Sequence, residues 1–203
     1  MTVGARDLAE AGLFCLEGFL DPGVCSRLRN EARRAVHAAA TVSKKDDVDA
    51  LDERTRRTKR AVVPPSAHAD LDERLAALLP ELAMHFGKPV SGFQQVQFLV
   101  YRQRDFFRAH QDNSDDPTLP DEIRARRISL VIFLNGQSRL PQPGCFCGGA
   151  LTFFNLPGME VRTNVEAREG MLLAFPSDVM HEVRPVTHGQ RFTAVTWFTA
   201  DAR

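Results

Sequence analysis

The hydrophobic and polar positions divide the chain into two parts with different periodicity. In the first part, apolar residues recur every three or four positions, which is the period of an amphipathic helix. Such a pattern predicts one helix over residues 22–40, opened by a proline at its first position. It predicts a second helix over residues 66–86, capped by Ser66 and closed by Gly87. Pro80 should kink this second helix or start a new turn.

After Gly92 the pattern changes to short runs that alternate and are rich in β-branched and aromatic residues. These runs are Gln95–Tyr101, Phe106–His110, Ile128–Leu134, Gly149–Phe154, Met171–Phe175, His181–Pro185 and Phe192–Phe198. Short strands separated by Pro, Gly and Asn favour an antiparallel sandwich or barrel. We therefore predict a mainly β fold, a double-stranded β-helix (jelly roll) with N-terminal supporting helices. Residues 1–92 form the helical support with a charged loop, and residues 93–203 form the jelly-roll domain; the two are expected to make one structural unit.

Composition narrows the classes of partner. Lys plus Arg and Asp plus Glu both number 26, so the net charge is zero. This balance argues against nucleic acid or an anionic membrane as the partner. No apolar run has the length of a signal peptide or of a membrane span. Four cysteines without a secretion signal are expected to be reduced thiols, which predicts a cytoplasmic protein. Cys145 and Cys147 are too few for a zinc site and are interpreted as two thiols in a loop.

Two His-x-Asp tripeptides occur, and only one suits a metal. His68-Ala-Asp70 lies at the start of the second predicted helix, where positions two apart point to nearly opposite sides. His110-Gln-Asp112 ends a predicted strand, where positions two apart share a face. The first pair is therefore interpreted as ordinary helix-start residues, and the second as a candidate pair of metal ligands.

His181 and Arg191 complete the candidate site. His181 follows an apolar strand, and strands distant in sequence become neighbours in a jelly roll. Two histidines and one carboxylate bind one face of a ferrous ion and leave its other positions open. Arg191 heads an otherwise apolar strand, where a charge is costly without a counter-ion. A bound dicarboxylate or a structural Asp or Glu would serve. The combination points to an iron- and 2-oxoglutarate-dependent oxygenase.

The segment from about Gln97 to Phe198 resembles the catalytic domain of the prolyl 4-hydroxylase-like branch of 2-oxoglutarate oxygenases. The motifs that carry the resemblance, in order, are Gln97-Phe-Leu-Val-Tyr101, His110-Gln-Asp112, Arg127-Ile-Ser129, Leu134-Asn135, Gly148-Gly-Ala-Leu-Thr-Phe153, Phe175-Pro-Ser, His181-Glu-Val, Pro185-Val and Gly189-Gln-Arg191. One departure is Arg104, where members of the family often have glycine. It is expected to stiffen or reshape the turn before the metal site.

The resemblance implies that His110, Asp112 and His181 bind Fe(II) and are the catalytic residues. It implies that 2-oxoglutarate chelates the iron and that Arg191 pairs with its distal carboxylate. Tyr101, the only tyrosine of the chain, is expected to donate its hydroxyl to the same cosubstrate. The alternative for Tyr101 is a half-buried aromatic ring with a wet tip. Oxygen is the second substrate, and ascorbate is expected to support activity.

The implied reaction is hydroxylation of an unactivated C–H bond, with a prolyl or other side chain of a protein or peptide as the first choice of substrate. Hydroxylation of a free small molecule uses the same site and is the alternative enzyme. A non-catalytic sensor that binds iron or 2-oxoglutarate is the third hypothesis. In peptidyl prolyl hydroxylases a mobile loop covers the substrate, and the charged segment 41–60 could be that lid; a plain solvated loop is the alternative. Arg124, Arg126 and Arg127 are expected on a solvated face, with Arg127 the one that could turn inward.

Overall fold

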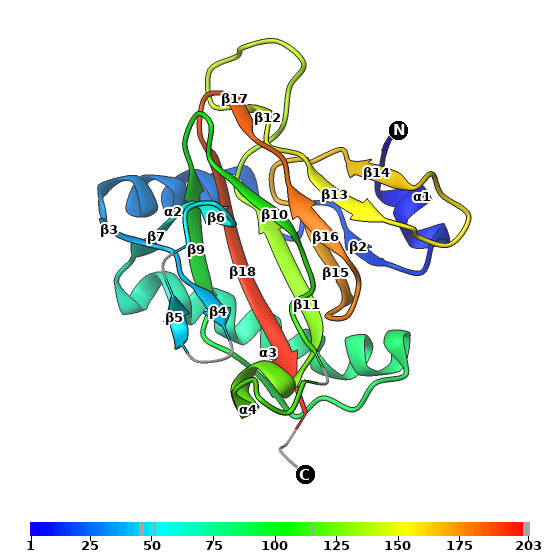
Figure 1. Ribbon diagram of the computed structural model, residues 1–203. Helices are drawn as coiled ribbons and strands as arrows, with labels where there is room; N and C mark the ends of the chain where they lie inside the picture. Colours follow the sequence, from blue (N-terminus) through cyan, green and yellow to red (C-terminus); the bar gives the residue numbers. More distant parts are fainter. Residues whose placement is uncertain (45–46, 51, 115, 201–203) are drawn as a thin grey trace.

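Two large sheets dominate the computed structural model, which describes residues 1–44, 47–50, 52–114 and 116–200 (Figure 1). The six-stranded sheet has the order β1 (Thr2–Val3), β14 (Arg162–Val165), β13 (Leu151–Phe154), β16 (His181–Val183), β10 (Phe106–His110) and β6 (Arg56–Arg57). The eight-stranded sheet has the order β2 (Phe14–Leu16), β15 (Leu172–Pro176), β11 (Arg126–Phe133), β18 (Arg191–Thr199), β9 (Gln97–Tyr101), β7 (Lys59–Val62) and β3 (Val36–Ala39), with β8 (Gly92–Phe93) paired to β18. Two short antiparallel pairs of strands lie outside these sheets: β12 (Cys147–Gly148) with β17 (Val186–His188), and β4 (Val42–Lys44) with β5 (Asp47–Ala50).

The central strands of the eight-stranded sheet are buried on both faces, and strand alternation decides which face each side chain occupies. On β9, Phe98 and Val100 face the helices, whereas Leu99 and Tyr101 face the six-stranded sheet. A cluster of buried apolar residues from both sheets fills the space between them. Tyr101 therefore points to the interior between the sheets, on the side where the candidate metal ligands lie. The predicted mainly β jelly roll with supporting N-terminal helices is confirmed.

Four helices accompany the sheets in the described residues: α1 (Ala5–Glu10), α2 (Pro22–Arg34), α3 (Pro65–Phe86) and α4 (Asp121–Arg124). Figure 1 shows α2 and α3 behind the eight-stranded sheet, and their Leu28, Leu71 and Leu75 pack into the core on that face. Burial of these leucines supplies most of what holds each helix in place, at roughly 1.5–3 kcal/mol per side chain. Within the described residues, no helix combines the length and the apolar composition that crossing a membrane would require.

Two details of the predicted helices are corrected. The first helix ends at Arg34 instead of Ala40, because residues 36–39 leave it to pair with β7 as strand β3. Ser66 does not cap the second helix; the helix begins one residue earlier, at Pro65, with Pro64 as its N-cap. The helix continues through Pro80, so it is not divided there, and a kink at Pro80 stays a prediction. Its end is as predicted, since Gly87 adopts the left-handed conformation, with φ of 59°.

Residues before position 93 supply strands to both sheets as well as helices. Residues 56–57 and 59–62 form strands, β6 in the six-stranded sheet and β7 in the eight-stranded sheet. The charged segment 41–60 thus becomes mostly strands; its positions 45, 46 and 51 lie outside the described residues, as do 201–203 at the end of the predicted second part. The division of the chain at residues 92 and 93, and movement of the charged segment, stay predictions.

Candidate active site

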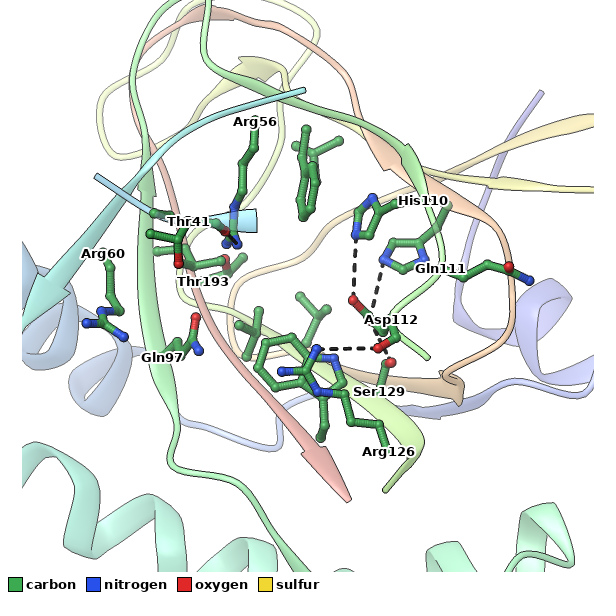
Figure 2. A pocket seen from close by; sticks show the side chains of 18 of the residues that line it. Thr41, Arg56, Arg60, Gln97, His110, Gln111, Asp112, Arg126, Ser129 and Thr193 are labelled. Carbon is green, nitrogen blue, oxygen red and sulfur yellow. Dashed lines mark hydrogen bonds and ion pairs between the residues drawn. The ribbon is translucent and has the colours of Figure 1, made fainter. Parts of the chain in front are cut away.

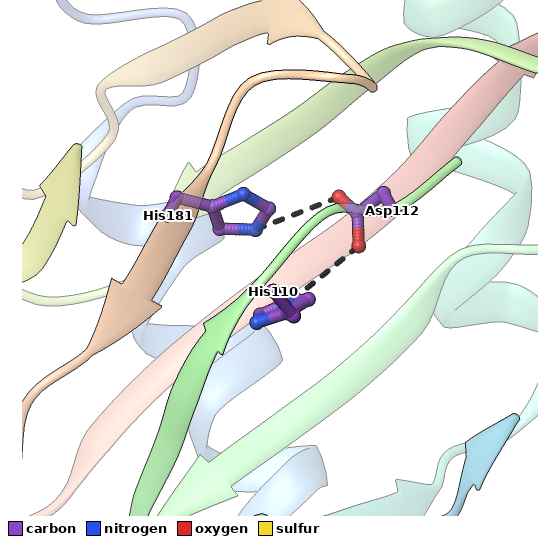
Figure 3. Close-up of side chains that lie close together, drawn as sticks. All are labelled: His110, Asp112 and His181. Atoms are coloured by element: carbon purple, nitrogen blue, oxygen red, sulfur yellow. Dashed lines mark ion pairs between the residues drawn. The ribbon is translucent and has the colours of Figure 1, made fainter. Parts of the chain in front are cut away.

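Two neighbouring strands of the six-stranded sheet, β10 and β16, bring His110, Asp112 and His181 together (Figure 3). His110 ends β10 and His181 begins β16, and the two residues are register partners in the antiparallel pair. Asp112 follows two positions later, just beyond the strand, and its backbone N–H donates to the Ser177 carbonyl at 2.9 Å. One ligand atom from each of the three residues lies within 4.8 Å of the others. Within the described residues this is the only such cluster of potential metal ligands.

Both imidazoles present the same nitrogen to the carboxylate. Nε2 of His110 lies 3.6 Å from one oxygen of Asp112, and Nε2 of His181 lies 3.6 Å from the other. The Nδ1 atoms face backbone carbonyls, that of His110 at 2.7 Å from Arg108 and that of His181 at 2.9 Å from Val179. Because a carbonyl only accepts, Nδ1 carries the hydrogen in each ring. The Nε2 lone pairs are thereby left for a metal ion.

The electrostatics of the cluster suit a divalent cation. The pKa of His181 is lowered to about 4, mainly by burial and to a smaller extent by the neighbouring His110, whereas Asp112 acts in the opposite direction. This imidazole is therefore neutral at pH 7. Burial alone would raise the pKa of Asp112, but His181, His110 and the Ser129 hydroxyl together hold it well below its usual range. The Ser129 hydroxyl donates to Asp112 at 2.6 Å. The donor set is therefore two nitrogens and one ionised carboxylate, the set that suits ferrous iron with open positions.

Arg191, the first residue of β18, lies deep in the interior beside the cluster. It is a register partner of Tyr101 on β9, and its guanidinium lies 5.1 Å from the Tyr101 ring centroid and 5.3 Å from that of Phe133. Its one hydrogen bond goes to the Thr193 hydroxyl at 3.4 Å, and its Nε has no partner. Burial lowers the pKa of Arg191 to about 10, with Tyr101 opposing, so the group remains charged at pH 7. No ion-pair partner of Arg191 exists among the described residues.

The Gly148-Gly149 motif makes room for this arginine. Gly149 has a φ of 58°, and a Cβ there would lie 2.9 Å from Val186 Cγ2 and 3.3 Å from Arg191 Cδ. Only glycine fits that conformation and that approach without strain. The motif therefore sets the position of the buried guanidinium.

A cavity of about 670 Å³ unites these groups (Figure 2). The candidate ligands, Arg191 and Tyr101 all line it. His68 lies elsewhere, half-buried in α3 and edge-on to the Phe98 ring at 5.4 Å. Asp70 belongs to the same helix. The structure thus assembles all five residues chosen from the sequence and leaves out the rejected His-x-Asp pair.

Three arginines of this cavity, namely Arg56, Arg60 and Arg126, were not predicted. Arg126 was expected on a solvated face, which is wrong: it lies 3.7 Å from the Trp197 ring centroid, and its Nε donates to Gln94 at 3.1 Å. The cause is a register irregularity in the pairing with β18 between Arg126 and Ile128, which breaks the alternation that would have sent Arg127 inward. Arg56, expected in a lid or a solvated loop, also lines the cavity. No signal in its Arg-rich segment singles it out.

The Arg104 departure has a structural counterpart. Arg104 is exposed and has a φ of 72°, at the third position of the turn Arg102–Asp105. A β-turn with positive φ there favours glycine. The turn is closed by Asp105, whose backbone N–H donates to the Arg102 carbonyl and whose carboxylate accepts from the Arg102 N–H. The turn before His110 is therefore formed in spite of the arginine, at some cost in backbone strain.

Comparison with known proteins identifies similar chains. Residues 96–199 match the family model described as the 2OG-Fe(II) oxygenase superfamily. A PKHD-type hydroxylase of Colwellia psychrerythraea is 36% identical over 87 residues, which are 42% of this chain and 35% of that protein. A PKHD-type hydroxylase of Shewanella sp. (strain ANA-3) is 28% identical over 111 residues, 55% of this chain and 45% of that protein. The chain thus spans less than half the length of these curated relatives.

Solved structures resemble almost the whole chain. A Pseudomonas putida prolyl-4-hydroxylase has a TM-score of 0.68 at 25% identity and covers 96% of both chains. A Trichoplax adhaerens prolyl hydroxylase, solved with a fragment of the hypoxia inducible factor oxygen degradation domain, has a TM-score of 0.69 at 17% identity, over 96% of this chain and 86% of that one. The second likeness concerns the fold alone.

Proposed function

Because the chain belongs to the 2OG-Fe(II) oxygenase superfamily, we propose that it is an Fe(II)- and 2-oxoglutarate-dependent dioxygenase that hydroxylates an unactivated C–H bond. One observation carries the proposal. A cluster of two histidines and an ionised aspartate shares a cavity with a buried arginine that has no ion-pair partner among the described residues. The first group suits the metal and the second suits a dicarboxylate.

His110, Asp112 and His181 would hold the iron, and Arg191 would pair with the distal carboxylate of 2-oxoglutarate. Tyr101 is in place to donate its hydroxyl to that carboxylate, since its ring is 2% exposed and borders the Arg191 guanidinium. Iron and 2-oxoglutarate, when bound, supply the oxygen-activating chemistry. The protein fixes the ligands through the carbonyls that orient the imidazoles and the serine that holds the carboxylate, and it surrounds them with aromatic side chains that exclude water.

We propose a prolyl or other side chain of a peptide or protein as the substrate. The likeness to a prolyl-4-hydroxylase over nearly the full length of both chains supports this choice. We also propose that ascorbate supports the activity, as in an enzyme whose iron must be kept ferrous. A cytoplasmic location stays a proposal, supported by the four unpaired cysteines.

The test measures metal binding and substrate-free succinate formation in ligand variants. Each of the variants His110→Ala, Asp112→Ala and His181→Ala should lose succinate formation. Each should also bind Mn(II) roughly a hundredfold more weakly, because removing a direct ligand has a larger effect than removing a hydrogen-bond partner of that ligand. His68→Ala and Asp70→Ala are matched controls and should change neither quantity. Succinate formation by any of the three ligand variants would contradict the assignment. Tight metal binding by the wild type without succinate would favour the sensor hypothesis.

A further inference from the structure

Arg56 places a positive charge next to the metal ligands. It lies on β6, opposite Phe107 of β10, and its guanidinium lies 4.6 Å from the centroid of the Phe107 ring. That ring stacks on His110, with centroids 3.5 Å apart and planes 18° apart. One aromatic ring therefore separates this cation from a proposed iron ligand. Figure 2 shows the Arg56 side chain reaching into the cavity toward Thr41 and Thr193.

The charge of Arg56 lacks a counter-ion in the described part of the chain. Its Nη1 donates to the Thr41 carbonyl at 2.8 Å, and its Nε is buried without a partner. Burial lowers the pKa of Arg56, and the groups that oppose this are the Tyr101 hydroxyl and Asp112. Asp112 is committed to the metal. A half-buried guanidinium whose buried Nε lacks a partner is costly until an anion arrives.

The balance of charge in the cavity also favours the binding of an anion. Four arginines line it, namely Arg56, Arg60, Arg126 and Arg191, against two carboxylates, those of Asp112 and Glu122. Ferrous iron and 2-oxoglutarate carry opposite double charges, so their binding leaves this positive excess unchanged. Arg191 is assigned to the cosubstrate, Arg126 is stacked on Trp197, and Arg60 is exposed. Arg56 remains as the half-buried cation available to a second anion.

We infer that the substrate of the proposed reaction is anionic and that its carboxylate binds Arg56. The planar guanidinium matches a carboxylate through two parallel N–H···O bonds. The carboxylate belongs either to an acidic residue beside the target side chain of a peptide or to a free carboxylic acid. The inference rests on the proposed function, because it assumes that Arg191 serves 2-oxoglutarate. Such a contact should favour an acid over its amide by roughly tenfold or more.

The only tryptophan of the chain offers a direct readout of binding, because Trp197 lines the same cavity. The protein is saturated with Mn(II) and 2-oxoglutarate without oxygen, and its fluorescence is followed during titration. The probes are acetyl-Ala-Pro-Asp-amide and acetyl-Asp-Pro-Ala-amide, each against its Asn counterpart, and acetyl-proline against acetyl-prolinamide. The first two pairs test an acidic peptide, and the last pair tests a free carboxylate.

At least one acid should bind roughly tenfold or more tightly than its amide, and Arg56→Met should remove that preference. Arg57→Met is the matched control, because Arg57 is exposed, adjacent on β6 and outside the cavity lining; it should keep the preference. Arg56→Gln, which keeps polar reach without charge, should behave as Arg56→Met does. The comparison of acid with amide in the wild type needs no variant, so it stands even where a variant fails to fold.

Equal binding of acids and amides, or no binding of any probe, would overturn the inference while leaving the proposed function intact. So would an Arg56→Met protein whose defect lies in 2-oxoglutarate binding, since Arg56 would then belong to the cosubstrate site. A wild-type protein that binds neither Mn(II) nor 2-oxoglutarate would instead contradict the proposed function. The probe pair with the largest ratio of acid affinity to amide affinity shows whether the substrate carboxylate belongs to an acidic peptide or to a free acid.

Discussion

Replacing Arg191 by methionine separates cosubstrate binding from protein stability. The guanidinium is buried among the Tyr101, Phe133 and Phe146 rings, and it has no ion-pair partner among the described residues. An interior cation of this kind destabilises the protein that lacks a bound carboxylate and stabilises the protein that has one. Arg191→Met should therefore lose 2-oxoglutarate affinity without losing the fold.

Both magnitudes follow from the site. Burial lowers the pKa of Arg191 to about 10, against an ordinary value of 12.5. That difference makes the charged form roughly 3 kcal/mol less favourable than in water. Arg191→Met removes this penalty but loses packing against the rings, at roughly 1–3 kcal/mol, so the two effects nearly cancel. The lost charge-assisted contact costs roughly 1.5–3 kcal/mol of binding, which is about tenfold to 150-fold in the dissociation constant of 2-oxoglutarate.

Thermal unfolding in the presence of Mn(II) measures both effects at once. A ligand present at a hundred times its dissociation constant stabilises the folded state by about 2.7 kcal/mol, and a hundredfold loss of affinity reduces this to about 0.4 kcal/mol. Arg191→Met should thus unfold near the wild-type temperature without 2-oxoglutarate and gain little from its addition. Arg191→Lys keeps the charge but not the two-pronged geometry. Its stabilisation by 2-oxoglutarate should lie between that of the wild type and that of Arg191→Met. Full stabilisation of Arg191→Met by 2-oxoglutarate would show that the cosubstrate binds elsewhere, and collapse of the variant without ligand would make Arg191 a structural residue.

Two further predictions concern stability without metal. Arg104→Gly should raise the free energy of unfolding by up to roughly 1 kcal/mol in urea titration, because the strain of φ at 72° outweighs the extra entropy of unfolded glycine; an equal or lower value contradicts this. The pKa of His181 is about 4 in the folded protein and about 6.5, the ordinary histidine value, in the unfolded chain. Between pH 6.5 and pH 4 only the unfolded chain therefore takes up this proton. The free energy of unfolding should fall by roughly 3 kcal/mol as the pH falls across that window. His181→Gln should flatten this dependence relative to the control His188→Gln, an exposed residue, and a slope unchanged in His181→Gln would assign it to other groups.

The core strands and the metal cluster could be predicted because their signals are local. Leu99 and Tyr101 alternate with Phe98 and Val100, and a strand buried on both faces keeps that order whatever it packs against. His110 ends β10 and Asp112 follows two positions later, just beyond the strand, so their nearness in the chain keeps the two side chains together. Only the meeting with His181 needed the fold, and the antiparallel pair of β10 and β16 provides it.

Other features depend on partners that the local sequence does not name. Residues 36–39 are Val-His-Ala-Ala and contain neither proline nor glycine, so the local sequence is compatible with a helix; pairing with β7 makes them a strand. Strands of two or three residues, such as β1 and β6, are defined almost entirely by the strand beside them. Arg56 and Arg126 escaped prediction for a related reason. One lies where the chain passes from one sheet to the other, and the other lies at a break in strand register.

The way in which the early strands complete both sheets also governs how the chain folds. Thr2 pairs with Asn164, and Cys15 pairs with Leu173. Forming these pairs closes long loops, and the loss of chain entropy precedes the stabilising contacts. Folding rates therefore fall as partners become more distant in sequence. During synthesis the first strands must wait, unpaired, until most of the chain has emerged. The arrangement therefore predicts slow, late and concerted folding, in which the proposed iron-binding pocket forms only when the last strand, β18, takes its place between β9 and β11.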